Sequence, residues 1–233
     1  MTEAALVNNW LFAAMGDIDQ EALRPALQRR ALGQGEVLLR SGDAVDDIHF
    51  PTSAHIANVM MAPTGESLAV STVGREGVTG LAAFMALEPV GWDAVTQVAG
   101  VVWSMSAEVL RSQAARSPAL NMILLQATHQ NQLEAHGQAL CASFHGVGPR
   151  LARWLLTLQE RTGLSTFALT QEHFATVLGV QRTTVVAAVR SLQDRGALAR
   201  ATRGRFVIRD RAILKRSACN CHARLPGFGP AEG

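Results

Sequence analysis

Residues 169–196 carry the clearest alternation of apolar and polar positions in the chain. Phe174 and Leu178 lie one helical turn apart, behind Thr170, whose hydroxyl can cap the start of a helix. Gly179 can adopt the left-handed conformation that ends such a helix. The pattern therefore predicts a short helix, a tight turn, and a second helix that begins within about three residues of this glycine.

Apolar residues recur at helical spacing in the second helix and determine which of its faces is buried. The residues that should point inward are Val185, Ala188, Val189 and Leu192. Those that should then point outward are Arg182, Thr183, Val186, Ala187 and Arg190. Two short helices with a glycine in the turn form the helix-turn-helix pattern, whose second helix enters the major groove of DNA. The alternative is an ordinary αα-hairpin within a hydrophobic core, and the flanking residues must distinguish between the two interpretations.

The residues after Gly196 predict a β-hairpin. Two β-like runs, 197–201 and 205–209, flank the glycine-containing turn Thr202-Arg203-Gly204. Its arginines are Arg200, Arg203, Arg205 and Arg209. A solvated basic face would explain any one of them, but a basic hairpin beside a helix-turn-helix favours contacts with DNA phosphates.

The first half of the chain has a different pattern of expected secondary structure. Residues 8–30 read as short helices, and residues 32–105 contain short β-like runs separated by glycine and proline turns, which predicts a β-roll or barrel. Ser106 and Pro118 each begin a helix, and the second helix continues to about Ser143. Residues 144–149 then carry two glycines and a proline, and we expect the hinge between domains there.

Charge is distributed unevenly along the 233 residues. From Gly146 onward, fourteen basic residues oppose five acidic ones, a net charge of +9, whereas the preceding part carries −7. This asymmetry favours a polyanionic partner for the C-terminal half alone. The sequence has neither an apolar run of about 18 residues nor the features of a signal peptide, so we expect a cytoplasmic protein without a membrane segment.

Four motifs resemble the DNA-binding domain of the CRP/FNR family of bacterial transcription regulators. They are residues 150–156, residues 169–172, Gly179-Val180 and residues 182–185. With the N-terminal half, the resemblance covers nearly the whole chain and implies an α+β fold. Its expected parts are a β-roll of the cyclic-nucleotide-binding type (1–117), a dimerisation helix with a hinge (118–145) and a winged helix-turn-helix domain (146–233).

This resemblance implies a homodimeric, sequence-specific transcription regulator that binds a near-palindromic double-stranded operator, and in this family such proteins often contact RNA polymerase. The residues expected at the DNA are Thr170, Gln171, Gln181, Arg182, Thr183, Thr184, Val186, Ala187, Arg190, Arg203 and Arg205. Arg182 can donate two hydrogen bonds to one guanine, and Val186 or Ala187 can contact a thymine methyl group. Thr183 replaces a common glutamate and Ala187 a common arginine, so the operator should differ from the best-known one. No catalytic motif suggests an enzyme.

Family members that bind cyclic nucleotides hold them with a Gly-Glu-Leu helix start and an Arg-Ser pair. Residues 77–81 correspond to the helix start, but Val78 replaces the glutamate, and the pair would fall near Trp92-Asp93. No arginine lies between Arg75 and Arg111. We therefore expect no cyclic-nucleotide cofactor, and the roll is then a structural relic or a pocket for another, unidentified effector.

The tail Cys219-Asn220-Cys221-His222 could supply metal ligands or a redox pair. Zinc would need a fourth ligand, and Cys141 is expected in another domain. The N-terminal cysteines that hold an iron–sulfur cluster in oxygen-sensing relatives are absent. We expect the tail to pack on the winged helix without a metal, and His129, His136 and His145 to be surface residues. The alternatives are a redox- or metal-responsive regulator that uses this tail and a sensor of another ligand in the roll.

Overall fold

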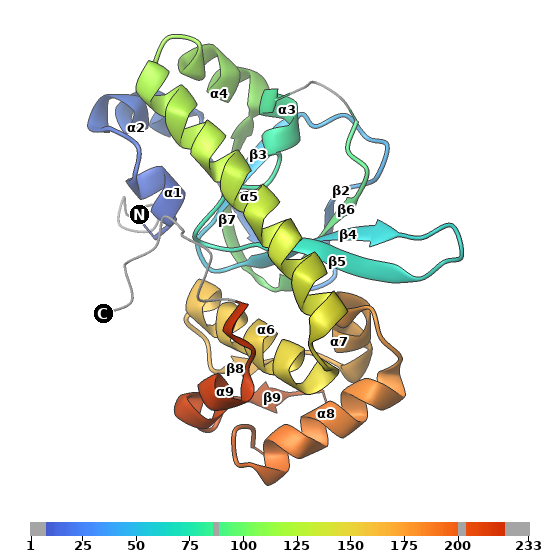
Figure 1. Ribbon diagram of the computed structural model, residues 1–233. Helices are drawn as coiled ribbons and strands as arrows, with labels where there is room; N and C mark the ends of the chain where they lie inside the picture. The colour runs from blue at the N-terminus through green and yellow to red at the C-terminus, as the bar shows by residue number, and fades with distance from the viewer. Residues whose placement is uncertain (1–7, 86–88, 200–203, 222–233) are drawn as a thin grey trace. The chain divides into compact units, whose positions relative to one another are not determined.

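The computed structural model describes residues 8–85, 89–199 and 204–221 (Figure 1). By their contacts these residues form two compact units, one comprising residues 8–58 and 72–132 and the other residues 59–71 and 133–221. Within the described ranges, no helix combines the length and the apolar character that a membrane crossing requires.

The first unit begins with two short helices, α1 (Trp10–Ala13) and α2 (Asp17–Leu23), followed by the 3₁₀ turn η2 (Arg24–Ala26) and strand β1 (Gln28–Leu32). The side chain of Asn9 caps α1 by accepting a hydrogen bond of 2.9 Å from the backbone N–H of Phe12. The sequence analysis expected short helices up to residue 30, and this expectation is wrong for residues 27–30. Pro25 lies in the 3₁₀ turn, Leu27 is already extended, and the next residues pair with another strand instead.

Six further strands complete the roll, together with the short helix α3 (Leu81–Met85). The strands are β2 (Val37–Leu39), β3 (Asp47–Pro51), β4 (His55–Met61), β5 (Ser67–Val73), β6 (Asp93–Val98) and β7 (Gly100–Ser106). They form one sheet in the order β1-β7-β3 and a second in the order β2-β6-β4-β5. β7 pairs antiparallel with both of its neighbours. The β-roll that the sequence predicts is confirmed.

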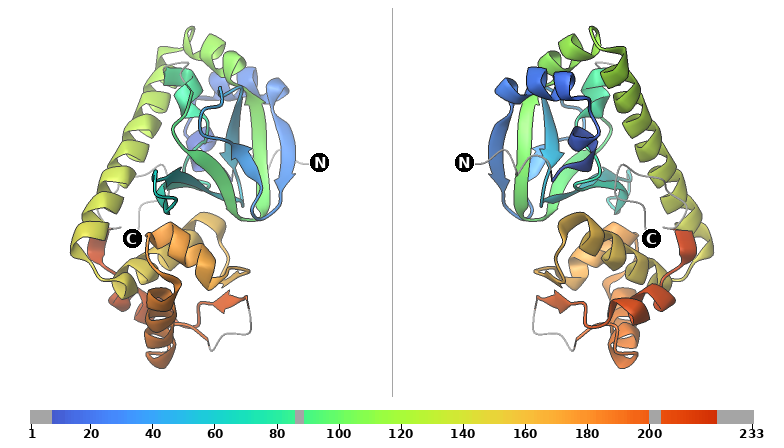
Figure 2. Two further views of the ribbon diagram at one scale, coloured as in Figure 1. Left: turned by 90° about the vertical axis from the view of Figure 1, so that its right-hand side faces the viewer. Right: turned by 90° about the vertical axis from the view of Figure 1, so that its left-hand side faces the viewer.

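Helix α4 (Ala107–Ala114) and the start of α5 (Pro118–Phe144) close the main core of this unit. Ser106 caps α4 by accepting from the N–H of Glu108, as the sequence predicts. Figure 2 shows α2 and α4 side by side at one end of the roll. The core residues include Leu11, Phe12, Ile48, Phe50, Leu110, Leu120 and Leu124. Phe12 and Phe50 meet edge to face, with ring centroids 5.7 Å apart.

Besides residues 59–71, the second unit contains the end of α5 and all later elements. These are α6 (Val147–Thr162), β8 (Thr166–Phe167), α7 (Gln171–Leu178), α8 (Arg182–Asp194), β9 (Phe206–Val207) and α9 (Arg211–Ser217). Helix α6 packs against α7, α8 and α9. The ring of Phe174 lies edge to face with Trp154 and with Phe206, at centroid distances of 5.3 and 4.7 Å. These rings join α6, α7 and β9 in one core.

The hairpin predicted after Gly196 is present in part. Leu198 and Ile208 form an antiparallel bridge, and the N–H of Ala199 donates to the carbonyl of Val207 over 2.9 Å. The regular partner of β9 is, however, β8, which the sequence analysis did not identify. Residues 200–203 lie outside the described residues.

Two buried side-chain contacts fix the end of α5 on α6. The guanidinium of Arg161 donates two hydrogen bonds to the carboxylate of Glu134, at 3.3 and 2.8 Å. Arg153 also donates to the side-chain oxygen of Gln138. Because both pairs are largely withdrawn from solvent, loss of one partner should destabilise the contact between α5 and α6.

His49, in β3, is a buried histidine that should make the stability of the protein depend on pH. Its side chain is only 5% exposed, and its Nδ1 lies 2.7 Å from the hydroxyl oxygen of Ser104. Burial lowers the pKa of His49 to about 4, with Asp47 raising it and Arg30 lowering it further. The unfolded chain, whose histidine keeps its ordinary pKa, therefore binds a proton first as the pH falls.

This histidine should make the free energy of unfolding decrease between about pH 6.5 and pH 4, by an amount on the order of 3 kcal/mol at pH 4. Above this window it should contribute no pH dependence. His49→Asn keeps a donor near the position of Nδ1 and removes the titration. Urea unfolding at several pH values should thus give a smaller loss of stability for the variant than for the wild type, and parallel pH profiles would contradict the assignment.

Candidate nucleic-acid interface

The turn between α7 and α8 has the geometry that the sequence predicts. The hydroxyl oxygen of Thr170 accepts from the N–H of His173 at 3.2 Å and caps α7. Gly179 ends α7 with φ of +61°, a conformation that glycine adopts at little cost. Gln181 is the N-cap residue of α8, so the two helices are separated by a three-residue turn, Gly179 to Gln181.

The predicted division of α8 into two faces is confirmed. Val185, Ala188, Val189 and Leu192 are buried. The residues expected to face outward are all exposed, together with two neighbours: Gln181, Arg182, Thr183, Thr184, Val186, Ala187 and Arg190. The apolar side chain of Val186 is 42% exposed. Such a side chain suits contact with a thymine methyl group.

The start of α8 is electrostatically suited to an anion. Its first turn contains no acidic residue, and Gln181 makes no side-chain capping bond. Arg182 occupies the first position, where its charge opposes the positive end of the helix dipole. This arrangement does not favour the isolated helix, but the positive end of the helix dipole and the guanidinium together favour a negatively charged or acceptor-rich partner.

Three of the other residues expected at the DNA lie in the described part of the second unit. Thr170 is exposed at the start of α7, and Gln171 beside it is half-buried. Arg205 is exposed next to β9. Arg203 lies outside the described residues. Sequence reasoning missed a supporting role for Arg150, which donates a hydrogen bond of 2.6 Å to the carbonyl of Leu178 and so binds the last turn of α7 to α6.

In the roll, Val78 and Asp93, which the sequence analysis assigned to nucleotide-binding positions of the family, take part in internal contacts. Val78 is 1% exposed and belongs to the main core. Thr79 and His49 exchange backbone hydrogen bonds of 3.1 and 3.0 Å. The carboxylate of Asp93 accepts a 2.8 Å bond from the N–H of Ser41. This hydrogen bond joins Asp93, at the start of β6, to the segment that follows β2.

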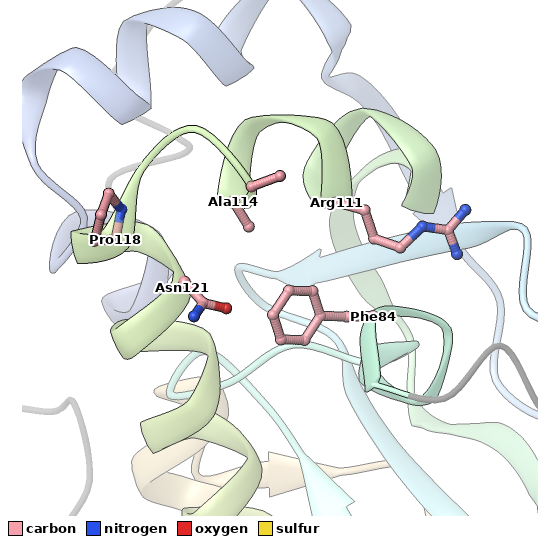
Figure 3. Close-up of a pocket in the computed structure, with 6 residues that line it drawn as sticks. Phe84, Arg111, Ala114, Pro118 and Asn121 are labelled. Atoms are coloured by element: carbon pink, nitrogen blue, oxygen red, sulfur yellow. The ribbon is translucent and has the colours of Figure 1, made fainter.

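A surface pocket of about 480 Å³ lies in the first unit. Its lining comes from α3, α4 and α5 and the turn between α4 and α5: Phe84, Arg111, Ala114, Ala115, Pro118 and Asn121. In Figure 3 the ring of Phe84 and the amide of Asn121 point toward each other. None of its lining residues belongs to a strand of the roll, and the lining offers one guanidinium and one amide.

The cysteine tail differs from its expected environment. Cys141, at the end of α5, lies in the same compact unit as the tail, and its Sγ is 3.4 Å from the Sγ of Cys219. Cys221 is placed 3.6 Å from Nδ1 of His145, which was expected on the surface. His222 lies outside the described residues.

Comparison with protein families identifies both halves of the chain. Residues 29–117 match the model of the cyclic nucleotide-binding domain, and residues 149–217 match the model of the Crp-like helix-turn-helix domain. The chain belongs to the CRP/FNR family of transcription regulators. This is a family of regulators and not of enzymes. No curated protein matches the sequence.

Solved structures share the fold of this CRP/FNR regulator. FixK2 from Bradyrhizobium japonicum aligns with a TM-score of 0.71 and 16% identity, over 83% of this chain and 98% of its own. The c-di-GMP-responsive regulator CLP from Xanthomonas campestris aligns with a TM-score of 0.67 and 16% identity, over 84% and 100%. A putative cAMP-binding regulatory protein from Silicibacter pomeroyi aligns with a TM-score of 0.65 and 22% identity, over 92% and 97%. At these identities the likeness concerns the fold alone.

Proposed function

We propose that this CRP/FNR regulator acts in the cytoplasm as a homodimer that reads a near-palindromic DNA operator with α8 in the major groove. The exposed face of α8 carries the proposal, because it presents a guanidinium, hydroxyls and a methyl-bearing side chain from one short helix. We divide the chain into the roll (1–117), the dimerisation helix with its hinge (118–145) and the DNA-binding domain (146–233).

Within this interface, Arg182 and Arg205 have different roles. Arg182 stands in the first turn of α8, the part of a recognition helix whose side chains reach base edges. Arg205 is exposed next to β9 in the hairpin segment, where an arginine meets the sugar-phosphate backbone. Base contacts discriminate between sequences, whereas phosphate contacts strengthen the binding of all sequences.

Arg182→Ala should therefore weaken operator binding by about 1–3 kcal/mol and reduce the difference in affinity between operator and random DNA. Arg205→Ala should weaken the binding of both DNAs by similar factors and lower the slope of log K against log salt by roughly one unit. The measurement is a salt titration of wild type and both variants on both DNAs. Equal weakening of the two DNAs by Arg182→Ala would show that Arg182 contacts phosphate and that the base-reading face lies elsewhere.

The surface of α5 supports the homodimer. Leu120, Leu124 and Ala127 are buried in the core of the first unit and are not available to a partner. Large apolar side chains on other parts of the helix remain exposed: Met122 (55%), Leu125 (46%), Leu140 (48%) and Phe144 (77%). A second copy of the same helix would remove these side chains from water.

The double variant Leu125→Glu/Leu140→Glu should therefore shift the protein to a monomer at micromolar concentration, because it places like charges on both helices of the interface. Light scattering gives the mass, and footprinting gives the length of DNA that is protected. Ile18→Glu, which replaces an 82% exposed side chain on α2, is the matched control and should remain a dimer. A wild-type monomer, or a double variant that still dimerises, would contradict this role of α5.

The packing of Val78 and the position of Asp93 further support a roll that does not respond to cyclic nucleotides. Calorimetric titration with cyclic AMP and with cyclic GMP should detect no binding in the micromolar range. A micromolar dissociation constant for either nucleotide would show that the roll uses other groups to hold the phosphate.

A further inference from the structure

Four potential metal ligands gather at the end of α5. Cys141 lies in the last turn of the helix and His145 directly follows it, while Cys219 and Cys221 follow α9. One ligand atom from each residue lies within 4.8 Å of all the others. Cys141 and Cys219 are buried, and His145 and Cys221 are half-buried. The cluster therefore combines residues that are up to 80 positions apart in the sequence.

The separations of these atoms fit a single tetrahedral ion. For Zn–S bonds of about 2.3 Å and Zn–N bonds of about 2.0–2.1 Å, the edges of the tetrahedron are about 3.8 Å between two sulfurs and about 3.6 Å between sulfur and nitrogen. The structure has 3.4 Å between Cys141 Sγ and Cys219 Sγ, and 3.6 Å between Cys221 Sγ and His145 Nδ1. These two separations differ from the ideal edges by a few tenths of an ångström at most, and all the other pairs lie within 4.8 Å, so side-chain displacements of no more than about 1 Å would complete the coordination geometry.

The backbone around the four side chains is held by its own hydrogen bonds. The N–H of His145 donates to the carbonyl of Cys141 at 3.1 Å, which continues the helical turn and places both side chains on one face. The N–H of Ala218 donates to the carbonyl of Leu214 at 3.0 Å, at the end of α9. The N–H of Cys219 donates to the carbonyl of Pro149 at 3.4 Å, next to the start of α6. These bonds hold the backbone at Cys141, His145 and Cys219 without an ion.

The charge near the cluster is also appropriate. Three thiolates around a divalent ion carry a single net negative charge, which is costly to bury alone. The positive charges of Arg150 and Arg153 act on the thiol of Cys141. Arg153 is only 5% exposed and, among the described residues, no group accepts a hydrogen bond from its Nε and no carboxylate pairs with it. An anionic metal complex would provide this buried guanidinium with an opposite charge.

From this geometry and charge we propose that Cys141, His145, Cys219 and Cys221 bind one zinc ion. Thiolates with an imidazole in a tetrahedron are typical of zinc, and four protein ligands leave no open position for catalysis. A cluster of several irons would need its ligands farther apart than this single-ion spacing allows. The bound ion is structural, and it cross-links the end of α5 to the segment after α9 within the second unit. The proposal does not depend on DNA binding.

The test uses the full chain without an affinity tag, purified under reducing conditions from cells supplied with zinc. Elemental analysis should give about one zinc per chain for the wild type. Cys141→Ser and His145→Gln should each reduce the bound zinc at least about tenfold, since each removes one of the four ligands. His136→Gln changes an exposed histidine of the same helix and is the matched control, so it should retain the zinc of the wild type.

A variant that unfolds would also lose its zinc, so cobalt(II) provides a second measurement on the wild type alone. Cobalt-substituted protein should show the intense visible bands of a tetrahedral site and a thiolate-to-metal charge-transfer band, and zinc should abolish both. The proposal is overturned if the reduced wild type binds no zinc, or if Cys141→Ser retains as much zinc as His136→Gln. Iron with acid-labile sulfide, or a Cys141–Cys219 disulfide in protein taken directly from cells, would overturn it in favour of redox chemistry.

Discussion

The burial of one face of α8 against α6 and α7 is the interaction on which the surface of the second unit depends. Each large apolar side chain that becomes buried contributes about 1.5–3 kcal/mol, so rotation of the helix about its axis would expose several of them at once. Because side-chain directions repeat with the helical period, burial of this face also determines which residues face solvent on the opposite side of α8. Arg182, Val186 and Arg190 must face solvent because Val185 and Val189 do not.

The same core explains why the flanking parts of this unit are positioned as they are. Trp154 and Phe206 meet Phe174, so that α6 and β9 share the core beneath α7. Arg150 and the Arg161–Glu134 pair add polar contacts that hold α6 to α7 and to the end of α5. The proposed zinc site extends this set of contacts to the segment after α9. The second unit thus presents α8 from a scaffold that is fixed at several points.

Secondary structure can be predicted well from the sequence where many residues repeat one period. It is predicted poorly where only a few residues, or partners far away in the sequence, determine the conformation. The two faces of α8 could be predicted because its apolar residues recur at helical spacing from Val185 to Leu192, which is about two turns. Strand β8 could not, because two residues, Thr166 and Phe167, show no period and depend on β9 for their conformation. The approach of Cys141 to Cys219 could not be predicted either, since it follows from the packing of α5, α6 and α9 and not from any local spacing.

The central claim is that α8 reads bases from the major groove, and methylation interference with dimethyl sulfate tests it most directly. This reagent methylates guanine N7 in the major groove and adenine N3 in the minor groove. On a DNA fragment selected by the protein from a random pool, we expect guanine methylation to block binding in two clusters about one helical turn apart. Interference confined to adenine N3, or no interference at all, would contradict a recognition helix in the major groove.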